Sequence, residues 1–308
     1  MIEVENLTKN YGKIQAVKGI SFTVNENEVL GFLGPNGAGK STTMNMIVGY
    51  LPMTSGTVKI NGIDISENPK EAKKHIGYLP EIPPLYMDMK VIEYLKFVAG
   101  IKGIKKQDRE FQIERAMSRL KITDKKNRVI KNLSKGYKQR VGFAQALLGD
   151  PKVIILDEPT VGLDPSQTKE VRDLIKRLGK DHTIIFSSHI LSEVNAICDR
   201  VLIINNGTIK AQDTTNNLET GTNEVLINLV VEGDRDKVEE LLSSIDGVKD
   251  ISDVVENSEN VYSYKIVLEN DNIRKSIVSQ LTMNDYSIIE INTLKKSLEE
   301  VFLDLTKK

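Results

Sequence analysis

The segment Gly34–Ser41, GPNGAGKS, constrains the fold of this chain more than any other feature. It fits the pattern G-x-x-x-x-G-K-[ST], follows the apolar run EVLGFLG, and is followed by a helical pattern from about Gly39. Glycines in such a loop let consecutive backbone N–H groups curl around an anion, and the new helix adds its positive end. The segment therefore predicts a phosphate-binding loop between a buried strand and a helix.

Individual residues of this loop have distinct expected contacts. Lys40 is predicted to reach β- and γ-phosphates, Ser41 to ligate Mg²⁺, and Thr42 to touch an α-phosphate. The alternative is a glycine-rich turn that feeds a helix and binds nothing. The remaining candidates for phosphate contact are Gly34, Pro35, Asn36, Gly37, Ala38 and Gly39.

A second candidate site follows from KVIILDEP, an apolar strand pattern that ends in Asp157 and Glu158. A carboxylate at the end of a strand can hold Mg²⁺ through its water shell, and its neighbour can polarise an attacking water. Paired acids at the end of a strand are also common as solvated termini. Beside a phosphate loop, Asp157 is predicted as a metal ligand and Glu158 as a catalytic group.

Apolar strand-like runs alternate with helical patterns over the first two thirds of the chain, which predicts an α/β fold with a largely parallel, buried sheet. Short strands are expected around Ile2–Leu7 and Ile20–Val24, and a turn is expected at Asn61-Gly62 within TVKINGIDI. These segments predict a small antiparallel sheet beside the parallel one. The pattern over about residues 84–150 is helical and charged, and it indicates a helical subdomain inserted into the sheet domain.

The polar run DTTNNLETGTN, after the strand that follows Asn205-Asn206-Gly207, breaks the periodicity and predicts a linker. A new unit begins near Glu219, and its pattern has the β-α-β-β-α-β order of a small α+β, ferredoxin-like fold, with one further helix at the end. We therefore expect two domains, residues 1–216 and 217–308.

Charge and composition exclude some classes of protein. The chain has 42 basic and 43 acidic side chains, so it lacks the basic excess typical of nucleic-acid-binding proteins. A single cysteine, Cys198, excludes an internal disulfide framework and fits a reducing, intracellular setting. No run reaches the 18 or so apolar residues of a spanning helix, and the first residues do not read as a secretory signal. A membrane role would need another chain.

Over Met1–Gln212 the chain resembles the nucleotide-binding subunits of ABC transporters, which are P-loop NTPases. The matching elements occur in the family's order: NLTKNYGKIQAVKGISF, the phosphate loop, IGYLPEIPPLY, LSKGYKQR, LDEPTVGLDP and SSH. The resemblance implies that Tyr11 stacks on adenine and that Glu81 lies in a loop that senses Mg²⁺ and touches a membrane subunit. It implies a γ-phosphate contact for His189, although a lone histidine more often packs or caps.

The same resemblance implies a paired arrangement of two heads. Ser134 and Gly136 would cap the γ-phosphate held by a second head, and Asp164 would lie in the loop that crosses between the heads. Ser134 and Asp164 could also have purely local structural roles, because serine is a common N-cap and Asp-Pro is a common start of a turn.

Two departures from the family pattern stand out. Lys135 and Tyr137 replace a glycine and a glutamine in the signature LSGGQ, and Glu81 stands where the family has glutamine. Both variants, together with the terminal SLEEVFLDLT, resemble the ATPases of ABC-2 type exporters, including the drug-export and gliding-motility groups.

The expected function is that of an ATPase head that binds ATP and Mg²⁺. It would pair with a second head, in a homodimer, and couple hydrolysis to an integral-membrane permease subunit from the cytoplasmic face of the membrane. Two alternatives stay open: an importer ATPase with a regulatory C-terminal domain, and a soluble ABC ATPase that acts on ribosomes or DNA.

Overall fold

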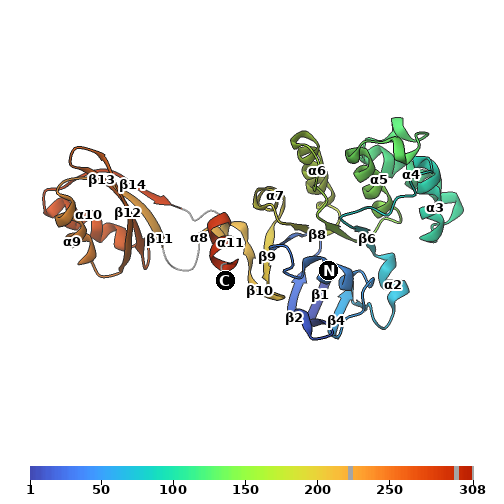
Figure 1. Ribbon diagram of the computed structural model, residues 1–308, viewed down its shortest axis with the longest axis horizontal. Coiled ribbons are helices and arrows are strands. Elements are labelled where there is room, and N and C mark those ends of the chain that lie inside the picture. Colours follow the sequence, from blue (N-terminus) through green and yellow to red (C-terminus); the bar gives the residue numbers. More distant parts are fainter. Residues whose placement is uncertain (221–224, 295–297, 307–308) are drawn as a thin grey trace. The chain divides into compact units, whose positions relative to one another are not determined.

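The computed structural model describes residues 1–220, 225–294 and 298–306, which fall into two compact units (Figure 1). The first unit comprises Met1–Thr214 together with the chain's end from Leu305, and the second comprises Thr215–Asp304. Among the described residues, no helix combines the length and apolar character that a bilayer crossing requires.

A six-stranded sheet of order β10-β9-β3-β8-β7-β6 forms the centre of the first unit. All neighbouring strands pair in parallel except β10, which is antiparallel to β9. Every residue of β3, β7 and β8 is buried, as in a parallel sheet with helices on both faces. The α/β prediction is confirmed. The strands are β3 (Val29–Leu33), β6 (Ile76–Leu79), β7 (Val153–Asp157), β8 (Thr183–Ser188), β9 (Arg200–Asn205) and β10 (Thr208–Thr214).

The predicted antiparallel sheet is present and has the order β2-β1-β4-β5. The expectation of short first strands was wrong, because β1 and β2 form a continuous hairpin of 10 and 11 residues. The register of the hairpin shifts at several points, one of them beside Asn6, whose φ is 46°. Backbone pairing continues on both sides of these shifts, so the polar segments of β1 and β2 belong to the same two strands. The strands are β1 (Ile2–Tyr11), β2 (Ile14–Val24), β4 (Ser55–Ile60) and β5 (Ile63–Asp64).

The two sheets of the first unit share one apolar core. Phe22 of β2 and Phe32 of β3 lie with ring centroids 5.7 Å apart, and helix α1 packs into the same core through Met44, Met46 and Ile47. This common core fixes the position of α1, and hence of the loop before it, against both sheets. The helices around the central sheet are α1 (Lys40–Ile47), α2 (Pro69–Lys74), α6 (Pro165–Leu178) and α7 (Leu191–Ile197).

The predicted helical insertion lies between β6 and β7, and its main helices are α3 (Val91–Ile101), α4 (Lys106–Arg119) and α5 (Lys135–Leu147). Lys102, after α3, donates from Nζ to the carbonyl oxygens of Ala146 (3.1 Å) and Leu148 (2.8 Å). Burial lowers the pKa of Lys102 to about 8. This lysine satisfies carbonyl groups at the carboxyl end of α5, whose amino end carries the signature residues.

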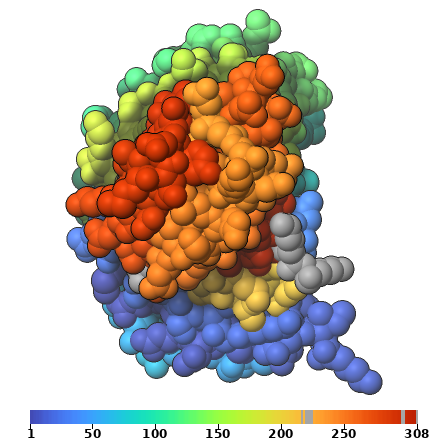
Figure 2. Space-filling model, turned by 90° about the vertical axis from the view of Figure 1, so that its left-hand side faces the viewer, coloured from blue at the N-terminus to red at the C-terminus, as the bar shows by residue number. Residues whose placement is uncertain are grey.

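The second unit contains an antiparallel sheet of order β12-β13-β11-β14, with the strands entering in the predicted β-α-β-β-α-β order. This confirms the ferredoxin-like fold. Its core includes Leu229, Tyr264 and Ile277. Figure 2 shows one face of this unit, coloured orange to red. The elements are β11 (Val225–Glu232), α9 (Arg235–Ser243), β12 (Val248–Ser258), β13 (Val261–Leu268), α10 (Ile273–Met283) and β14 (Ser287–Leu294).

The polar run expected as a linker is more ordered than predicted. Its first two residues, Asp213 and Thr214, end β10, and the next six form helix α8 (Thr215–Thr220). The rest of the run lies outside the described residues. The terminal helix is α11 (Leu298–Thr306), in which Leu298 is buried. Asparagine and threonine side chains are compatible with short helices, so polarity alone did not exclude α8.

Gly31 in the middle of β3 tests the packing of α7 on the central sheet. A Cβ atom on Gly31 would lie 2.7 Å from Val194 Cγ1 and 2.8 Å from Cys198 Sγ, both buried. Gly31→Ala is therefore expected to lower the free energy of unfolding by about 1–3 kcal/mol through overpacking. Urea denaturation followed by circular dichroism measures the change.

Gly100→Ala is the matched control, because its Cβ in α3 would meet only Arg109, at 3.7 Å. Alanine within a helix is expected to raise the free energy of unfolding by roughly 0.5 kcal/mol. Equal effects of the two variants would contradict the direct packing of α7 on β3.

Candidate functional site

The loop between β3 and α1 approaches neighbouring backbone so closely that side chains are excluded. A Cβ on Gly34 would lie 2.4 Å from the carbonyl oxygen of Ile204, and one on Gly39 would lie 2.8 Å from that of Ala16. Gly39, at φ 107°, is the N-cap of α1 and gives the helix no side-chain cap. The first N–H groups of α1 are therefore left to bind an anion.

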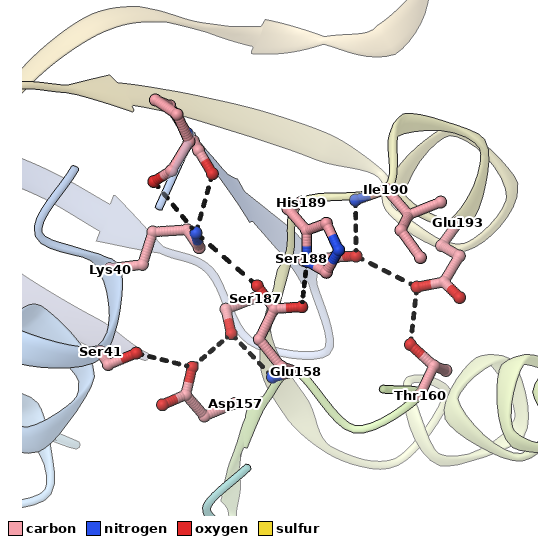
Figure 3. Close-up of polar contacts among 12 residues, drawn as sticks. Lys40, Ser41, Asp157, Glu158, Thr160, Ser187, Ser188, His189, Ile190 and Glu193 are labelled. Atoms are coloured by element: carbon pink, nitrogen blue, oxygen red, sulfur yellow. Dashed lines mark hydrogen bonds and ion pairs between the residues drawn. The ribbon is translucent and has the colours of Figure 1, made fainter. Parts of the chain in front are cut away.

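Lys40 is buried in this loop, with 6% of its surface exposed. Its Nζ donates to the carbonyl oxygen of Gly34 (2.7 Å) and more weakly to that of Pro35 (3.3 Å). It also lies 3.6 Å from Glu158 Oε1 (Figure 3). The loop thus holds a cation inside the molecule, where its charge is weakly screened.

Asp157, at the end of β7, accepts hydrogen bonds from the hydroxyl groups of two serines. Its Oδ1 accepts from Ser187 Oγ of β8 (2.6 Å) and, at 3.4 Å, from Ser41 Oγ of α1. Ser187 Oγ in turn accepts from the backbone N–H of Glu158 (2.9 Å). Ser187 was not predicted as a site residue, although its place at the end of an apolar strand that leads to His189 was a usable signal.

Glu158 occupies a left-handed backbone conformation, φ 47°, directly after β7. Such a conformation is uncommon for a non-glycine residue, and its cost of roughly 1 kcal/mol or more is tolerated mainly at functional sites. Glu158 is 7% exposed, and its Oε2 accepts from His189 Nδ1 (2.8 Å), as shown in Figure 3. The carboxylate therefore lies between a lysine and a histidine.

A cavity of about 380 Å³ brings most of the predicted residues together. It combines backbone of the loop, the Lys40–Glu158 pair, His189 and, from the segment after β6, Glu81. Two of its residues were not predicted, Ala16 and Val161, and as small apolar residues they carry no chemical signal in the sequence. The lining residues are Ala16, Asn36, Gly37, Gly39, Lys40, Ser41, Thr42, Glu81, Glu158, Val161 and His189.

Tyr11, predicted to stack on adenine, is not among the residues that line this cavity. It lies at the end of β1 with 49% of its surface exposed, and Lys9 Nζ lies 5.3 Å from the centre of its ring. Gly34, Pro35 and Ala38 contribute to the loop behind the cavity without lining it.

Ser134, Gly136 and Asp164 also lie outside the cavity lining, at the amino ends of α5 and α6. Ser134 Oγ accepts from Tyr137 N–H (3.4 Å), and Asp164 Oδ1 accepts from Gln167 N–H (2.9 Å). Hydrogen bonds from Gln167 and then Ser166 lower the pKa of Asp164. Ser134 and Asp164 are exposed N-caps here, whereas Gly136 is buried in the first turn of α5, and none of the three lines the cavity.

The departures in the signature segment have local packing partners. The ring of Tyr137 lies between Lys125 Nζ (5.1 Å) and Arg140 Cζ (5.7 Å), a cation–π arrangement. Lys135 reaches the loop after β7, where a Cβ on Gly162 would lie 1.9 Å from its Nζ. Tyr137 therefore has two cationic neighbours, and Lys135 lies beside the loop after β7.

Comparison with known proteins identifies the family. The family model described as ABC transporter matches residues 17–161. The chain is 35% identical over 309 residues to the "Uncharacterized ABC transporter ATP-binding protein YhcH" of Bacillus subtilis (strain 168), covering 99% of this chain and 96% of that protein. It is 32% identical to the "Linearmycin resistance ATP-binding protein LnrL" of the same organism, covering 99% and 98%.

A solved structure gives the same result for the first unit. "Dimeric Structure of MJ0796, a Bacterial ABC Transporter Cassette" aligns with a TM-score of 0.64 at 25% identity, covering 70% of this chain and 98% of that one. The chain belongs to the ATP-binding proteins of ABC transporters, a family of ATPases.

Proposed function

We propose that this chain is the ATP-hydrolysing subunit of an ABC-2 type exporter, with an ATP-binding domain over residues 1–216 and an accessory domain over residues 217–308. The observation that carries the proposal is the convergence of Lys40, Glu158 and His189 on one cavity beside a phosphate-binding loop. A buried cation and a carboxylate–histidine pair at the positive end of a helix are the groups that phosphoryl transfer requires.

The residues present fit ATP and Mg²⁺. The start of α1, which has no side-chain cap, offers N–H groups to phosphate oxygens, and Lys40 offers a buried ammonium. Ser41 and Asp157 offer a hydroxyl and a carboxylate 3.4 Å apart, which are oxygen ligands of the kind Mg²⁺ prefers, with Glu81 on the same cavity. No group of three or more His, Cys, Asp and Glu side chains suited to a metal occurs within the described part of the chain. A weakly ligated ion that keeps its waters, as Mg²⁺ does, fits this donor set.

In the proposed mechanism, the loop and Lys40 bind the β- and γ-phosphates, and Thr42 lies on the α-phosphate side. Bound Mg²⁺ would neutralise charge that develops on the phosphate oxygens. Glu158 orients the attacking water and accepts its proton, and the left-handed turn directs its carboxylate into the cavity. His189 positions this carboxylate through Nδ1. A ring that carries a proton on both nitrogens would also donate from Nε2 to the γ-phosphate.

We further propose that two heads pair when ATP binds. Ser134 and Asp164 are exposed at helix ends outside the head's own cavity, where they are available to a second copy, and the buried Gly136 lies in the first turn of α5. The N–H groups at the start of α5 would then contact the γ-phosphate bound by the partner. Lys135 would add positive charge near it. The dimeric cassette found by comparison supports this arrangement.

Variants of two cavity residues test the catalytic assignment. Lys40→Ala is expected to weaken ATP binding by about 100-fold, because a buried ammonium bonded to an anion contributes roughly 3 kcal/mol. Glu158→Gln is expected to keep ATP affinity within about threefold and lower kcat by about 100-fold or more, because the amide cannot accept the proton. Fluorescent-nucleotide titration and phosphate release measure the two quantities.

Size-exclusion chromatography with ATP supplies the second readout for Glu158→Gln. The ATP-loaded dimer should accumulate in this variant and not in Lys40→Ala. Normal turnover by Glu158→Gln would mean that Glu158 is not the catalytic base.

The proposed link to a membrane subunit is the segment that follows β6. Glu81 lines the cavity, and the next residues expose apolar side chains, Ile82 (83%), Tyr86 (55%) and Met87 (45%). Tyr86 packs edge-on against Phe97 of α3, with centroids 5.3 Å apart. This patch is continuous with the cavity along the chain and is suited to an apolar segment of a permease. The head would then lie on the cytoplasmic face of the membrane.

Export is proposed over import because of the signature and Glu81 variants and the similarity to a linearmycin resistance protein. The expected result of gentle solubilisation from the native host with ATP is stoichiometric recovery of a polytopic membrane protein with the tagged chain, identified by mass spectrometry. Recovery of ribosomal or soluble proteins alone would contradict the transporter role. Inhibition of the ATPase by a small molecule that binds residues 217–308 would favour the importer alternative.

A further inference from the structure

A buried carboxylate lies behind the proposed catalytic pair. Glu193, in α7, is 3% exposed, and its Oε2 accepts from two hydroxyl groups, Thr160 Oγ1 at 2.7 Å and Ser188 Oγ at 3.1 Å (Figure 3). Both hydroxyl residues are buried as well. A carboxylate enclosed in this way costs several kcal/mol unless hydrogen bonds compensate it, so its presence calls for a structural or functional reason.

The hydrogen bonds of Glu193 join two loops that carry catalytic candidates. Thr160 lies two residues after Glu158, and Ser188 directly precedes His189. Glu193 can only accept, so it fixes the direction of both hydroxyls. Ser188 Oγ then accepts from Ile190 N–H (3.0 Å). One oxygen atom thus accepts hydrogen bonds from both segments that flank the Glu158–His189 contact.

Glu193 also has a rigid support. The next residue, Val194, packs against Gly31 of β3 so closely that a Cβ on the glycine would lie 2.7 Å away. The packing of Val194 therefore holds the backbone next to Glu193 against β3, an inner strand of the central sheet. Groups that must stay within a fraction of an ångström of a productive geometry need such support.

The loop fixed at Thr160 continues to Asp164. Its turns are closed by Val161 N–H to Glu158 O (3.2 Å) and Leu163 N–H to Thr160 O (3.1 Å). Asp164 then caps α6. The first residue of this loop, Thr160, is thus bonded to Glu193, and its last residue, Asp164, is bonded to the first turn of α6.

We propose that Glu193 is a positioning residue of the ATPase, which aligns Glu158 with His189 and sets the start of the loop Thr160–Asp164 through its bonds to Thr160 and Ser188. This inference rests on the proposed catalytic role of Glu158. It predicts an effect on turnover, because the residue does not line the nucleotide cavity.

Steady-state kinetics of the full chain with Mg-ATP test the proposal. Glu193→Ala is expected to lower kcat by about 10- to 100-fold and to leave KM and nucleotide affinity within about threefold. Glu193→Gln is expected to keep kcat within about threefold, because both hydroxyls donate to a single oxygen that an amide oxygen can replace. A merely structural role would not predict this separation of kcat from KM or the rescue by glutamine.

Glu28→Ala is the matched control. Glu28 is also a buried glutamate (9% exposed), and it pairs with Arg200 at the amino end of β3, away from the cavity. Its removal should lower thermal stability without changing kcat per folded molecule. Loss of kcat in proportion to stability in both variants would overturn the proposal.

Thr160→Val combined with Ser188→Ala provides a test that leaves Glu193 in place, should Glu193→Ala not fold. This double variant should lower kcat at least tenfold with unchanged KM, and adding Glu193→Gln should then have little further effect. Wild-type kcat in the folded double variant would overturn the proposal. Normal turnover by Glu158→Gln would instead reject the catalytic role of Glu158, whichever result Glu193 gives.

Discussion

The buried ammonium group of Lys40 is the interaction around which the site is arranged. It lies among loop carbonyl oxygens and one carboxylate, because the loop before α1 packs directly against the backbone of β9 and against Ala16. A charge in such a place is tolerated only with full hydrogen bonding, and it attracts anions strongly because little water screens it. The glycines allow the close approach of the loop, the shared core fixes the position of α1, and the turn at Glu158 places its carboxylate beside Lys40.

The chemistry is divided between two surfaces of the same unit. The phosphate loop, Glu158 and His189 line the cavity, whereas the N-caps Ser134 and Asp164 lie outside its lining, at the amino ends of α5 and α6. A single head therefore has the groups to bind phosphate in its own cavity, and the two N-caps are left for the proposed contact with a second head. In the proposed cycle, ATP binding and the pairing of two heads would be one event, because each site would be completed by the other head.

The signature segment tolerates its two replacements because both find partners within the unit. Tyr137 lies between two cationic side chains, and Lys135 lies over a glycine in the loop after β7. Gly136 lies so close to the side chain of Gln167 that a Cβ atom on it would be 2.3 Å from Gln167 Oε1. The start of α5 is therefore preserved while its surface charge is altered, which is the change expected to affect a facing phosphate more than the fold.

Elements whose signals are local could be predicted from the residues alone. The phosphate loop, the parallel strands, the helical insertion and the order of the ferredoxin-like unit follow from spacing, apolar runs and turn residues within short segments. Local signals were weaker for β1, β2 and α8, where register irregularities and polar side chains hide the pattern. The roles of Lys40 and Glu158 could be predicted because each stands at a recognisable end of a strand or helix.

The side chains that support those groups could not be predicted, because they come from segments that are distant in the chain. Ser187 meets Asp157, and Thr160 meets Glu193, across separations of 30 and 33 residues. No periodicity or motif links such positions, because the contacts arise when strands that are distant in sequence become neighbours in a parallel sheet. The same reason explains Tyr11: its place at the end of β1 is local, but whether it reaches the cavity depends on the packing of the two sheets.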